Sequence, residues 1–373
     1  MSTFVRDANR PNLLQVVLSL NAGGTERLVV DMTLALNEHA NIAVVCLDER
    51  GTWAERLRDQ GVQVEVLGRK PGFDASLVGG IRRIVKDIHK PAIHCHHYTP
   101  FIYGGLASLT IPGSKLVYTE HGRYGDGPPS LKRRFANQLF GRMPGRFFAV
   151  SHDLRHHLVG EGIPTAKLEV NHNGIDPGAV TTVQARNEIR NELGLHRDDW
   201  VVGTVARLDP VKDLQVLIAA AAQIKDRAPK LKLVFVGDGP ERQGLEAAVE
   251  AQGLTQRVMF LGHRDDARRL MAGFDLYFNC SVIEGISVTI LEALSAGLAV
   301  AASRVGGTPE ILGDDEYGLM FESRSPDAAA KALLSLYDNE SQRQQLMARA
   351  RPRIDAAFSV ETMLRKYTDA YGW

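Results

Sequence analysis

The chain has 373 residues, of which 44% are hydrophobic and 24% are charged, and its formal net charge is +0. This length fits two domains better than one core, and the lack of net positive charge argues against a general nucleic-acid-binding protein. Its three cysteines, Cys46, Cys95 and Cys280, have no metal-ligand spacing and do not form an even set for disulfides, so we expect a protein of the reducing cytoplasm.

Short apolar runs alternate with helix-like stretches through the first half of the chain. The expected strands are 13–20, 42–47, 62–68, 92–97, 115–122 and 146–151, and the expected helices are 25–39, 53–61 and 77–88. Strands that alternate with helices predict a parallel sheet covered on both faces.

The same alternation begins again after a loop near residues 176–184. The expected strands are 200–208, 231–239, 258–263, 274–281 and 298–303, and the expected helices are 182–195, 214–224, 242–253 and the stretch containing Glu292. We therefore predict an α/β chain with two Rossmann-like domains, 1–180 and 181–352, followed by a C-terminal helix, 353–373; that this helix returns to the first domain is implied only by the family resemblance given below. Open α/β sheets bind ligands at the carboxyl ends of their strands, so the ligand is expected in a cleft between the domains.

Two of the predicted strand ends carry residues suited to phosphate. Gly23 and Gly24 follow the first strand and precede a helix, where the backbone can approach a ligand closely, although an ordinary glycine turn has the same pattern. Arg207 and Lys212 lie just past the strand 200–208 and can bracket a diphosphate; the alternative is a solvated loop.

Residues 284–292 place two carboxylates around a helix start. Glu284 belongs to the loop after strand 274–281, and the amides of Gly285, Ile286 and Ser287 form the expected helix N-terminus, which can take phosphate oxygens. Glu292 lies inside the helix, where it can accept both hydroxyls of a ribose, while Glu284 can accept hydroxyls of an attached sugar. Two exposed glutamates remain the alternative.

A series of short motifs occurs in a fixed order along nearly the whole chain. These are GGTE (23–26), TEHG (119–122), AVSHDLRHHL (149–158), NGID (173–176), ARLDPVKD (206–213), VGDGPER (236–242), FLGHR (260–264), the pair Glu284 and Glu292, and ASRVGGTPEIL (302–312). With these motifs the chain resembles the retaining glycosyltransferases of family 4, which have the GT-B fold of two facing Rossmann-like domains.

The resemblance implies a role for each candidate residue. Arg207 and Lys212 would hold the donor diphosphate, and Gly23 and Gly24 would approach its phosphates. Glu284 would hold the donor sugar, with His121 beside the reacting sugar, and Glu292 would hold the ribose. His263 and Arg264 would border the base, and Gly285, Ile286 and Ser287 would complete the donor site. Many relatives have Phe and then Gly or Pro where this chain has Ile286 and Ser287, which puts the donor-sugar preference in doubt.

The resemblance also implies the reaction. A nucleotide sugar, with uracil favoured over guanine as its base, would donate the sugar with retention to a hydroxyl of a glycan, a lipid-linked molecule or a small molecule. No Asp-x-Asp pair is present to hold a metal ion on the phosphates, so the two cations would replace the metal, and no other cofactor is expected. The TEHG form with Glu120 is most similar to enzymes of exopolysaccharide and capsule assembly.

Other interpretations stay open at this stage. A nucleotide-sugar 2-epimerase or a phosphorylase-type transferase can share the fold, and a non-catalytic sugar-nucleotide-binding protein would belong to another class.

The run HCHH (94–97) suggests a metal site or, alternatively, a strand end with His94 and His96 on one face. Residues 130–148 carry five cations, no acid and interleaved apolar residues, which predicts either an anionic membrane surface as partner, at the inner face of the membrane, or a core helix with solvated cations.

Overall fold

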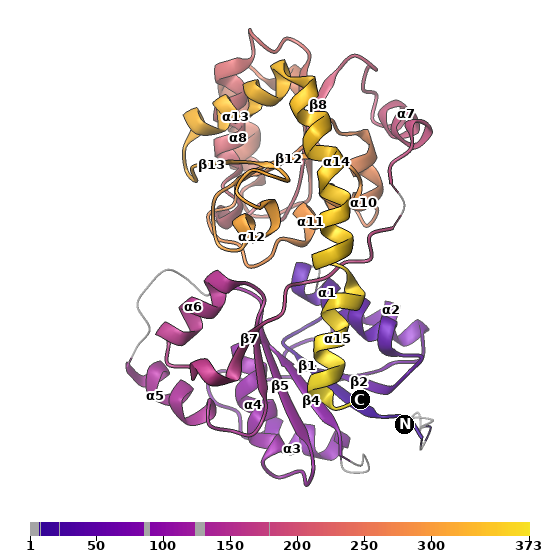
Figure 1. Cartoon of the computed structure of the whole chain (residues 1–373), viewed down its shortest axis with the longest axis vertical. Coiled ribbons are helices and arrows are strands. Elements are labelled where there is room, and N and C mark those ends of the chain that lie inside the picture. Colours follow the sequence, from indigo (N-terminus) through magenta and orange to yellow (C-terminus); the bar gives the residue numbers. More distant parts are fainter. Residues whose placement is uncertain (1–6, 8, 22, 86–89, 124–130, 179) are drawn as a thin grey trace. The chain divides into compact units, whose positions relative to one another are not determined.

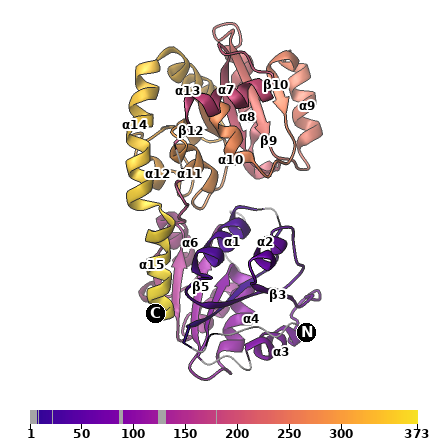
Figure 2. The same cartoon turned by 90° about the vertical axis from the view of Figure 1, so that its right-hand side faces the viewer.

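The computed structural model of the chain describes residues 7, 9–21, 23–85, 90–123, 131–178 and 180–373 (Figures 1 and 2). Residues 86–88 of an expected helix lie outside the described residues, as does the side chain of Lys132. The chain divides into two compact units: unit 1 consists of Met1–Gly174 and Val360–Trp373, and unit 2 consists of Ile175–Ser359.

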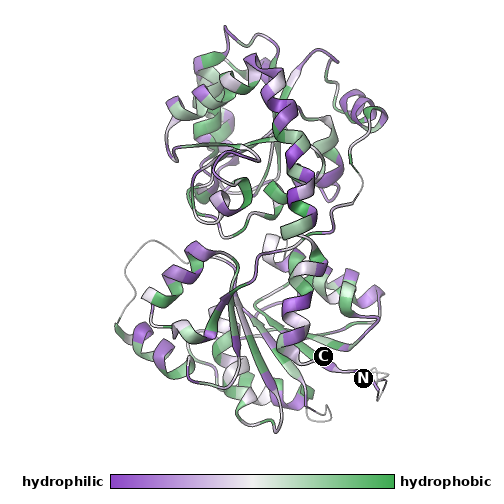
Figure 3. Ribbon diagram, viewed as in Figure 1, coloured by the Kyte–Doolittle hydropathy of each residue, from purple (hydrophilic) through white to green (hydrophobic). Residues whose placement is uncertain are grey.

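Unit 1 is built on a seven-stranded sheet whose strands pair in parallel, in the order β3-β2-β1-β4-β5-β6-β7. The strands are β1 (Asn12–Val17), β2 (Asn41–Cys46), β3 (Gln63–Val66), β4 (Ala92–His96), β5 (Lys115–Glu120), β6 (Arg146–Ala149) and β7 (Leu168–Val170). The central strands are buried almost throughout, as expected of a parallel sheet covered on both faces, and Figure 3 shows them largely in the hydrophobic colour.

Helices cover this sheet and include the C-terminal end of the chain. They are α1 (Gly24–Leu36), α2 (Ala54–Asp59), α3 (Ser76–Val85), α4 (Tyr98–Ser108), α5 (Leu131–Phe140), α6 (His152–Gly160) and α15 (Val360–Tyr371). The buried residues of α15, Met363, Tyr367, Ala370 and Tyr371, recur at helical spacing and therefore share one face. That face packs with Leu13 in a core cluster of unit 1, so α15 is part of this unit.

Unit 2 has a six-stranded sheet whose strands also pair in parallel, in the order β10-β9-β8-β11-β12-β13. The strands are β8 (Trp200–Val205), β9 (Leu231–Val236), β10 (Val258–Phe260), β11 (Leu276–Asn279), β12 (Ala299–Ser303) and β13 (Leu319–Phe321). The helices are α7 (Val183–Glu192), α8 (Leu214–Ile224), α9 (Arg242–Ala251), α10 (Ala267–Leu270), α11 (Val288–Ser295), α12 (Thr308–Leu312), α13 (Pro326–Asp338) and α14 (Glu340–Ala357).

The core of unit 2 forms where α8 and α13 pack on the sheet. Leu217 and Leu333 of these helices are fully buried against Val202, Phe235 and Phe278 of the strands. Alanines fill much of the α8 sequence LQVLIAAAAQI, so the helix can approach its neighbours closely.

The two parallel sheets with helices confirm the α/β class predicted from the sequence. Helix α4 was missed because it is apolar on all sides and therefore lacks an amphipathic period. Its Gly104 is required by packing, since a Cβ there would lie 2.3 Å from Sγ of Cys95 on β4. Within the described part of the chain, no helix is both long and apolar enough to cross a membrane.

Candidate functional site

The strand order of each sheet shows where a ligand is expected. In unit 1 the order reverses between β1 and β4, and in unit 2 it reverses between β8 and β11. Ligands of doubly wound sheets bind at the carboxyl ends of the strands beside such a reversal, because the two flanking loops diverge there and leave a crevice. Gly23 and Gly24 follow β1, Arg207 and Lys212 follow β8, and Glu284 follows β11.

In unit 2 the structure brings Lys212 and Glu284 together. Lys212 ends the short 3-10 turn Pro210–Lys212, and its Nζ lies 2.7 Å from Oε1 of Glu284. The same carboxylate accepts a 2.6 Å hydrogen bond from Oγ of Ser281 and a 3.4 Å one from Nδ2 of Asn279. One carboxylate therefore holds the loops after β8 and β11 together, an ion pair that the sequence did not reveal.

The ionisation of Glu284 follows from these partners. Its side chain is only 10% exposed, so burial acts to raise its pKa. The charge and hydrogen bond of Lys212, together with hydrogen bonds from Ser281 and Asn279, outweigh burial and lower the pKa below its ordinary value. Glu284 is therefore a carboxylate that can accept hydrogen bonds from sugar hydroxyls.

Arg207 lies in a different setting from Lys212. Its side chain is 71% exposed, and its guanidinium pairs with Asp209, whose side chain is 11% exposed. One carboxylate thus holds Arg207 by one side while most of the guanidinium faces solvent. This leaves donors of Arg207 free to bind an anion.

The loop that carries Glu284 is supported by Gly306 and Gly307, the glycine pair of the motif at 302–312. Gly306 has φ +50°, and a Cβ on it would lie 1.8 Å from the carbonyl oxygen of Glu284, so the turn requires glycine. The amide of Gly307 donates a 2.9 Å hydrogen bond to the carbonyl oxygen of Gly285. The VGG of the sequence therefore shapes the backbone on which Glu284 and the following helix are mounted.

Helix α11 starts directly after this loop. Ser287 is its N-cap, with Oγ accepting from the amide of Ile290 at 3.5 Å, and Ile286 is 4% exposed. The first amides of the helix form a partial positive charge that can bind phosphate. Glu292 lies in the same helix and is 4% exposed, so it is not one of two exposed glutamates.

His263 and Arg264 follow β10. His263 is 59% exposed, with Nε2 3.2 Å from Oδ1 of Asp265. Arg264 binds the Asp266 carboxylate through two hydrogen bonds of 2.8 and 2.9 Å and reaches Glu192 at 3.2 Å. These carboxylates raise the pKa of Arg264, so its guanidinium is tied into a surface ion-pair cluster.

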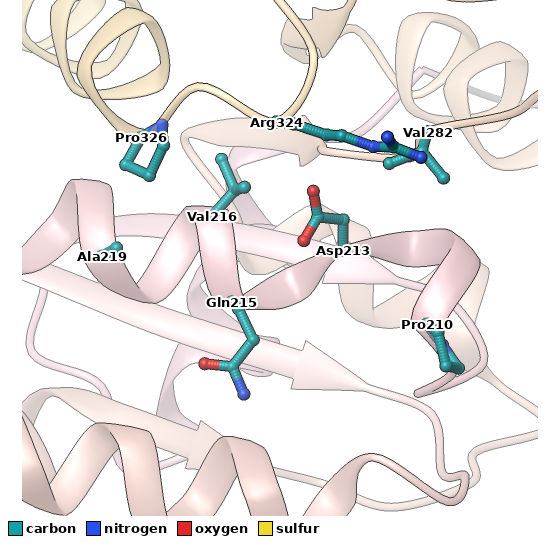
Figure 4. Close-up of a pocket in the computed structure, with 8 residues that line it drawn as sticks. All are labelled: Pro210, Asp213, Gln215, Val216, Ala219, Val282, Arg324 and Pro326. Atoms are coloured by element: carbon teal, nitrogen blue, oxygen red, sulfur yellow. The ribbon is translucent and has the colours of Figure 1, made fainter.

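A pocket of about 450 Å³ lies beside the 3-10 turn that carries Lys212 (Figure 4). Its lining residues are Pro210, Asp213, Gln215, Val216, Ala219, Val282, Arg324 and Pro326. The carboxylate of Asp213 points toward the Arg324 side chain; burial raises the pKa of Asp213, and the Arg324 charge acts against that rise. No residue predicted for the site lines this pocket.

In unit 1 the two glycines of GGTE differ in their surroundings. Gly23 is the N-cap of α1, and a Cβ on it would lie 2.2 Å from a carboxylate oxygen of Glu26. Gly24 is the first residue of α1, and a Cβ on it would meet nothing within 4 Å. Packing within unit 1 therefore does not explain glycine at position 24.

A buried network of histidines lies at the carboxyl ends of β4 and β5. Nε2 of His121 lies 3.0 Å from Nδ1 of His96, and Nε2 of His96 lies 2.8 Å from Oε1 of Gln15 on β1. His94 lies beside His96 on the same face of β4, as expected of residues two apart in a strand, with ring centroids 4.1 Å apart. Nδ1 and Nε2 of His94 contact Tyr371 and Thr119 at 2.7 and 2.8 Å.

These contacts determine where the protons of the network lie. Because Oε1 of Gln15 can only accept, Nε2 of His96 donates and its Nδ1 accepts from Nε2 of His121. Nδ1 of His121 is then left as an acceptor. Burial and neighbouring histidines hold the pKa of His121 well below its usual value, so the imidazole is neutral.

Glu120, the residue before His121, holds the chain around it. Its Oε1 lies 2.7 Å from Nδ1 of His97 and accepts from the amide of His121 at 3.1 Å, while Oε2 accepts from the hydroxyl of Tyr118 at 2.8 Å. Burial acts to lower the pKa of His97, but Glu120 outweighs it and raises the pKa. His97 and Glu120 form a hydrogen-bonded pair, and the same carboxylate holds the backbone amide of His121.

The sequence identified His121 but missed most of its supports. Gln15, Thr119 and Tyr371 reach the network from three separate elements, and α15 supplies Tyr371 from the far end of the chain. The one available signal was the polar residue Gln15 inside an apolar strand, where a buried amide requires partners.

Two family models match the chain. The N-terminal part, residues 22–179, matches "Glycosyltransferase Family 4", and residues 185–353 match "Glycosyl transferases group 1". The chain belongs to glycosyltransferase family 4. It is therefore an enzyme of the transferase class, and the resemblance drawn from its motifs is confirmed.

Curated relatives of the family 4 chain have names of the same class. It is 26% identical to N-acetyl-alpha-D-glucosaminyl L-malate synthase of Bacillus anthracis over 311 residues, which cover 81% of this chain and 79% of the relative. It is 29% identical to D-inositol 3-phosphate glycosyltransferase of Salinispora tropica, covering 76% and 64% of the two chains. It is 25% identical to putative glycosyltransferase EpsD of Bacillus subtilis, covering 77% and 79%.

Solved glycosyltransferase structures share the fold of this family 4 member. HepE of Anabaena, solved in complex with UDP, superposes with a TM-score of 0.86 at 24% identity and covers 97% of this chain and 99% of that chain. The complex of HepE with UDP-glucose gives a TM-score of 0.84 at the same identity and coverage. These likenesses establish the GT-B architecture of two domains with mostly parallel sheets.

Proposed function

We propose that this glycosyltransferase moves a sugar from a nucleoside-diphosphate sugar to a hydroxyl acceptor with retention and without a metal ion. The observation that carries the proposal is the 2.7 Å pair of Lys212 and Glu284 at the strand reversal of unit 2. The pair supports the proposal because a cation that can bind a diphosphate lies beside a carboxylate that can bind a sugar, and these two parts are adjacent in a donor molecule.

Arg207 and Lys212 act on the leaving group. As the glycosidic bond breaks, negative charge grows on the diphosphate, and cations placed in advance stabilise that charge more than they stabilise the bound donor. The amides at the start of α11 add partial positive charge in the same loop region. Together these groups supply the charge that a metal ion provides in other transferases.

The remaining residues orient the donor. Glu284 accepts sugar hydroxyls and Glu292 accepts the ribose hydroxyls, while Gly23, Gly24 and the backbone from Gly285 to Ser287 allow close approach of the phosphates. His121 contributes a neutral imidazole whose Nδ1 accepts a hydrogen bond from a hydroxyl of the reacting sugar. His263 and Arg264 border the base.

Retention follows if the departing phosphate accepts the proton of the acceptor on the face it leaves. The acceptor oxygen then attacks from that same face, the bond to the phosphate breaks, and the proton moves to a phosphate oxygen. An α-linked nucleotide sugar would thus yield an α-glycoside.

Uridine is the base we propose for the donor. HepE, which shares the fold, was solved with UDP and with UDP-glucose, and the name of the Bacillus anthracis relative specifies an N-acetylglucosaminyl product. UDP-glucose and UDP-N-acetylglucosamine are therefore the first donors to test. As acceptor we propose a glycan or lipid-linked hydroxyl in polysaccharide or glycoconjugate biosynthesis, used in the cytoplasm at the inner face of the membrane.

The test has two stages. A thermal-shift screen over UDP- and GDP-sugars should single out a donor, since a ligand at 100 times its Kd stabilises the folded protein by about 2.7 kcal/mol. Release of nucleoside diphosphate from that donor is then measured with and without a panel of hydroxyl acceptors. Acceptor-dependent release and an unchanged anomeric configuration are expected; conversion of the donor without acceptor into a sugar inverted at C2 would indicate the epimerase, which no observation favours.

A further inference from the structure

Helix α5 is held to unit 1 by its polar residues. Nη2 of Arg133 pairs with Oε2 of Glu161 at 2.9 Å, and Nδ2 of Asn137 donates a 2.9 Å hydrogen bond to the carbonyl oxygen of Glu161. The guanidinium of Arg133 also lies 4.7 Å from the ring centre of Tyr98. Asn137 is fully buried and the side chain of Glu161 is 5% exposed, so the inner side of α5 is a polar anchor.

Three large apolar residues of α5 face the opposite way. Leu131, Phe135 and Leu139 are 82%, 71% and 56% exposed. They are spaced by four residues and therefore form one ridge along the helix. In Figure 3 hydrophobic and hydrophilic bands alternate along the α5 ribbon. A helix that serves a protein core turns such a ridge inward, so the core-helix interpretation of this stretch is wrong.

The surroundings of the ridge are positively charged. Arg134 and Arg142 are exposed, and residues 130–148 contain no Asp or Glu. Arg133 is neutralised by Glu161, and Arg146 by Glu169 and Asp369, so Arg134 and Arg142 are the arginines of this stretch that carry charge toward solvent beside the ridge. An exposed apolar ridge with unbalanced cations is complementary to a surface that has both apolar and anionic groups.

We propose that the exposed α5 face, consisting of Leu131, Arg134, Phe135 and Leu139, docks on an anionic lipid bilayer together with Arg142, which lies in the turn just after the helix. The ridge enters the boundary between headgroups and acyl chains, and the two guanidinium groups bind lipid phosphates. The polar anchor to Glu161 stays within unit 1, so the helix need not unfold or detach to bind. The use of a lipid-linked acceptor rests on the proposed function. Binding of the α5 face to lipid does not depend on the proposed function.

The direction of α5 makes this placement useful. Strands β5 and β6 are parallel, so the helix that connects them runs back from the carboxyl edge of the sheet to its amino edge. The Leu131 end of α5 therefore lies toward the edge where His121 follows β5. A bilayer bound along α5 would bring lipid-linked hydroxyls to that edge.

The test is cosedimentation of the full chain with vesicles of phosphatidylcholine, with and without phosphatidylglycerol. Binding is expected with the anionic vesicles and should weaken as salt rises, because exposed charges are screened. Replacing Arg134 and Arg142 by Glu should weaken binding by roughly 25-fold or more, since each cation near an anionic surface contributes about fivefold. Phe135→Ser with Leu139→Ser should also abolish sedimentation, because it removes the ridge without changing charge.

The matched control reverses the same amount of charge elsewhere. Arg197 and Lys230 are exposed residues of unit 2, and Arg197→Glu with Lys230→Glu should bind vesicles as the wild type does. Equal weakening by this control, or unchanged binding by the α5 variants, would overturn the proposal. A wild-type dimer in ultracentrifugation that Phe135→Ser dissociates would also overturn it, since a second copy would then cover the face.

Two further measurements separate this proposal from the proposed function. Circular dichroism and thermal unfolding show whether the α5 variants fold, and exposed substitutions of this kind are expected to leave stability nearly unchanged. Donor turnover with a water-soluble acceptor should equal that of the wild type in every α5 variant. If no donor is turned over at all, vesicle binding and its loss in the variants still decide the inference.

Discussion

The polar groups at the carboxyl edge of the unit 1 sheet are buried and mostly neutral, whereas those of the unit 2 sheet are charged and partly exposed. His121 is 7% exposed and hydrogen-bonded to a second neutral histidine. Arg207 is 71% exposed, and Lys212 is 24% exposed in its pair with Glu284. The first six strands of unit 1 have the same order as the six strands of unit 2, and β7 extends the sheet of unit 1 at one edge. The difference therefore lies in the residues that follow the strands.

This difference suits the two kinds of ligand group in the proposed reaction. A sugar hydroxyl is neutral, and a neutral imidazole with a defined tautomer can orient it without the desolvation of a charge. A diphosphate is doubly charged and increases its charge during the reaction, so it requires cations. One fold therefore provides two chemical environments according to which side chains occupy the strand ends.

For the charged strand ends of unit 2, the largest expected effect comes from removing one of the two cations that are proposed to bind the donor diphosphate. Arg207→Ala and Lys212→Ala should each lower turnover by about 10²–10³-fold, the scale of losing one preorganised transition-state donor. Turnover of the identified donor and acceptor is measured at saturating concentrations. Wild-type turnover in either folded variant would contradict the assignment.

Stability should reveal the buried carboxylates that the two cations hold. Arg207→Ala should lower the free energy of unfolding by about 1–3 kcal/mol, because Asp209, whose side chain is 11% exposed, loses its ion-pair partner. Lys212→Ala should destabilise by about 1–3 kcal/mol, since Glu284 loses a partner in a site where its side chain is 10% exposed. Arg197→Ala, at an 87% exposed side chain, is the matched control and should alter neither quantity.

The next largest expected effect is a loss of kcat/KM on substitution of Gly24, at the mostly neutral strand ends of unit 1. Gly24→Ala should keep or raise stability, because alanine favours a helix and the added Cβ meets nothing within 4 Å. It should nonetheless lower kcat/KM by about 10–100-fold, since the methyl group would hold the donor phosphates away from the backbone. Unchanged kcat/KM would show that no ligand approaches Gly24.

Acid should affect the two units unequally. The pKa of His94, His96 and His121 lies well below the usual value, chiefly because of burial, so the unfolded chain binds more protons than the folded one below about pH 6.5. Stability from these residues is present above the unfolded pKa and is lost as pH falls, at up to about 1.4 kcal/mol per pH unit for each histidine. His97 opposes this: its raised pKa gives stability that is present below the unfolded pKa and lost as pH rises through the folded one.

Hydrogen exchange at pH 7.5 and pH 5.5 can measure this contrast. The strands of unit 1 should lose protection at the lower pH. Those of unit 2 should not, because the lowered pKa of Glu284 matters only when pH falls to the ordinary carboxyl range. Equal loss of protection in both units, after correction for the intrinsic exchange rate, would contradict the neutral-histidine account.

The smallest expected effect is that of a chelator. Activity should be the same with and without EDTA, because in the proposed mechanism Arg207, Lys212 and the α11 amides take over the positive charge of a metal ion. Activity that disappears in EDTA and returns with Mg²⁺ or Mn²⁺ would show that these groups are insufficient.

The alternation of apolar runs and helical stretches was enough to predict two parallel α/β sheets. Apolar periodicity did not reveal the strands β7 and β13, because three residues are too few to show an alternation of apolar and polar residues. It also did not reveal helix α4, because that helix is apolar on all sides and shows no amphipathic period. The glycines and charged residues at strand ends were found from local pattern, since a strand end and a helix start are defined by neighbours in the chain.

The sequence by itself determined which residue types follow the strands: cations and glutamates in unit 2, glycines and His121 in unit 1. Only the tertiary structure decided how they are paired, because Lys212 and Glu284 are 72 residues apart and His94 and Tyr371 are 277 apart. It also decided that α5 turns Arg133 inward and Phe135 outward, since the position of Glu161 selects the buried side of that helix. Local pattern assigns residues to an element, whereas burial and hydrogen-bond satisfaction across the fold assign each residue its partner.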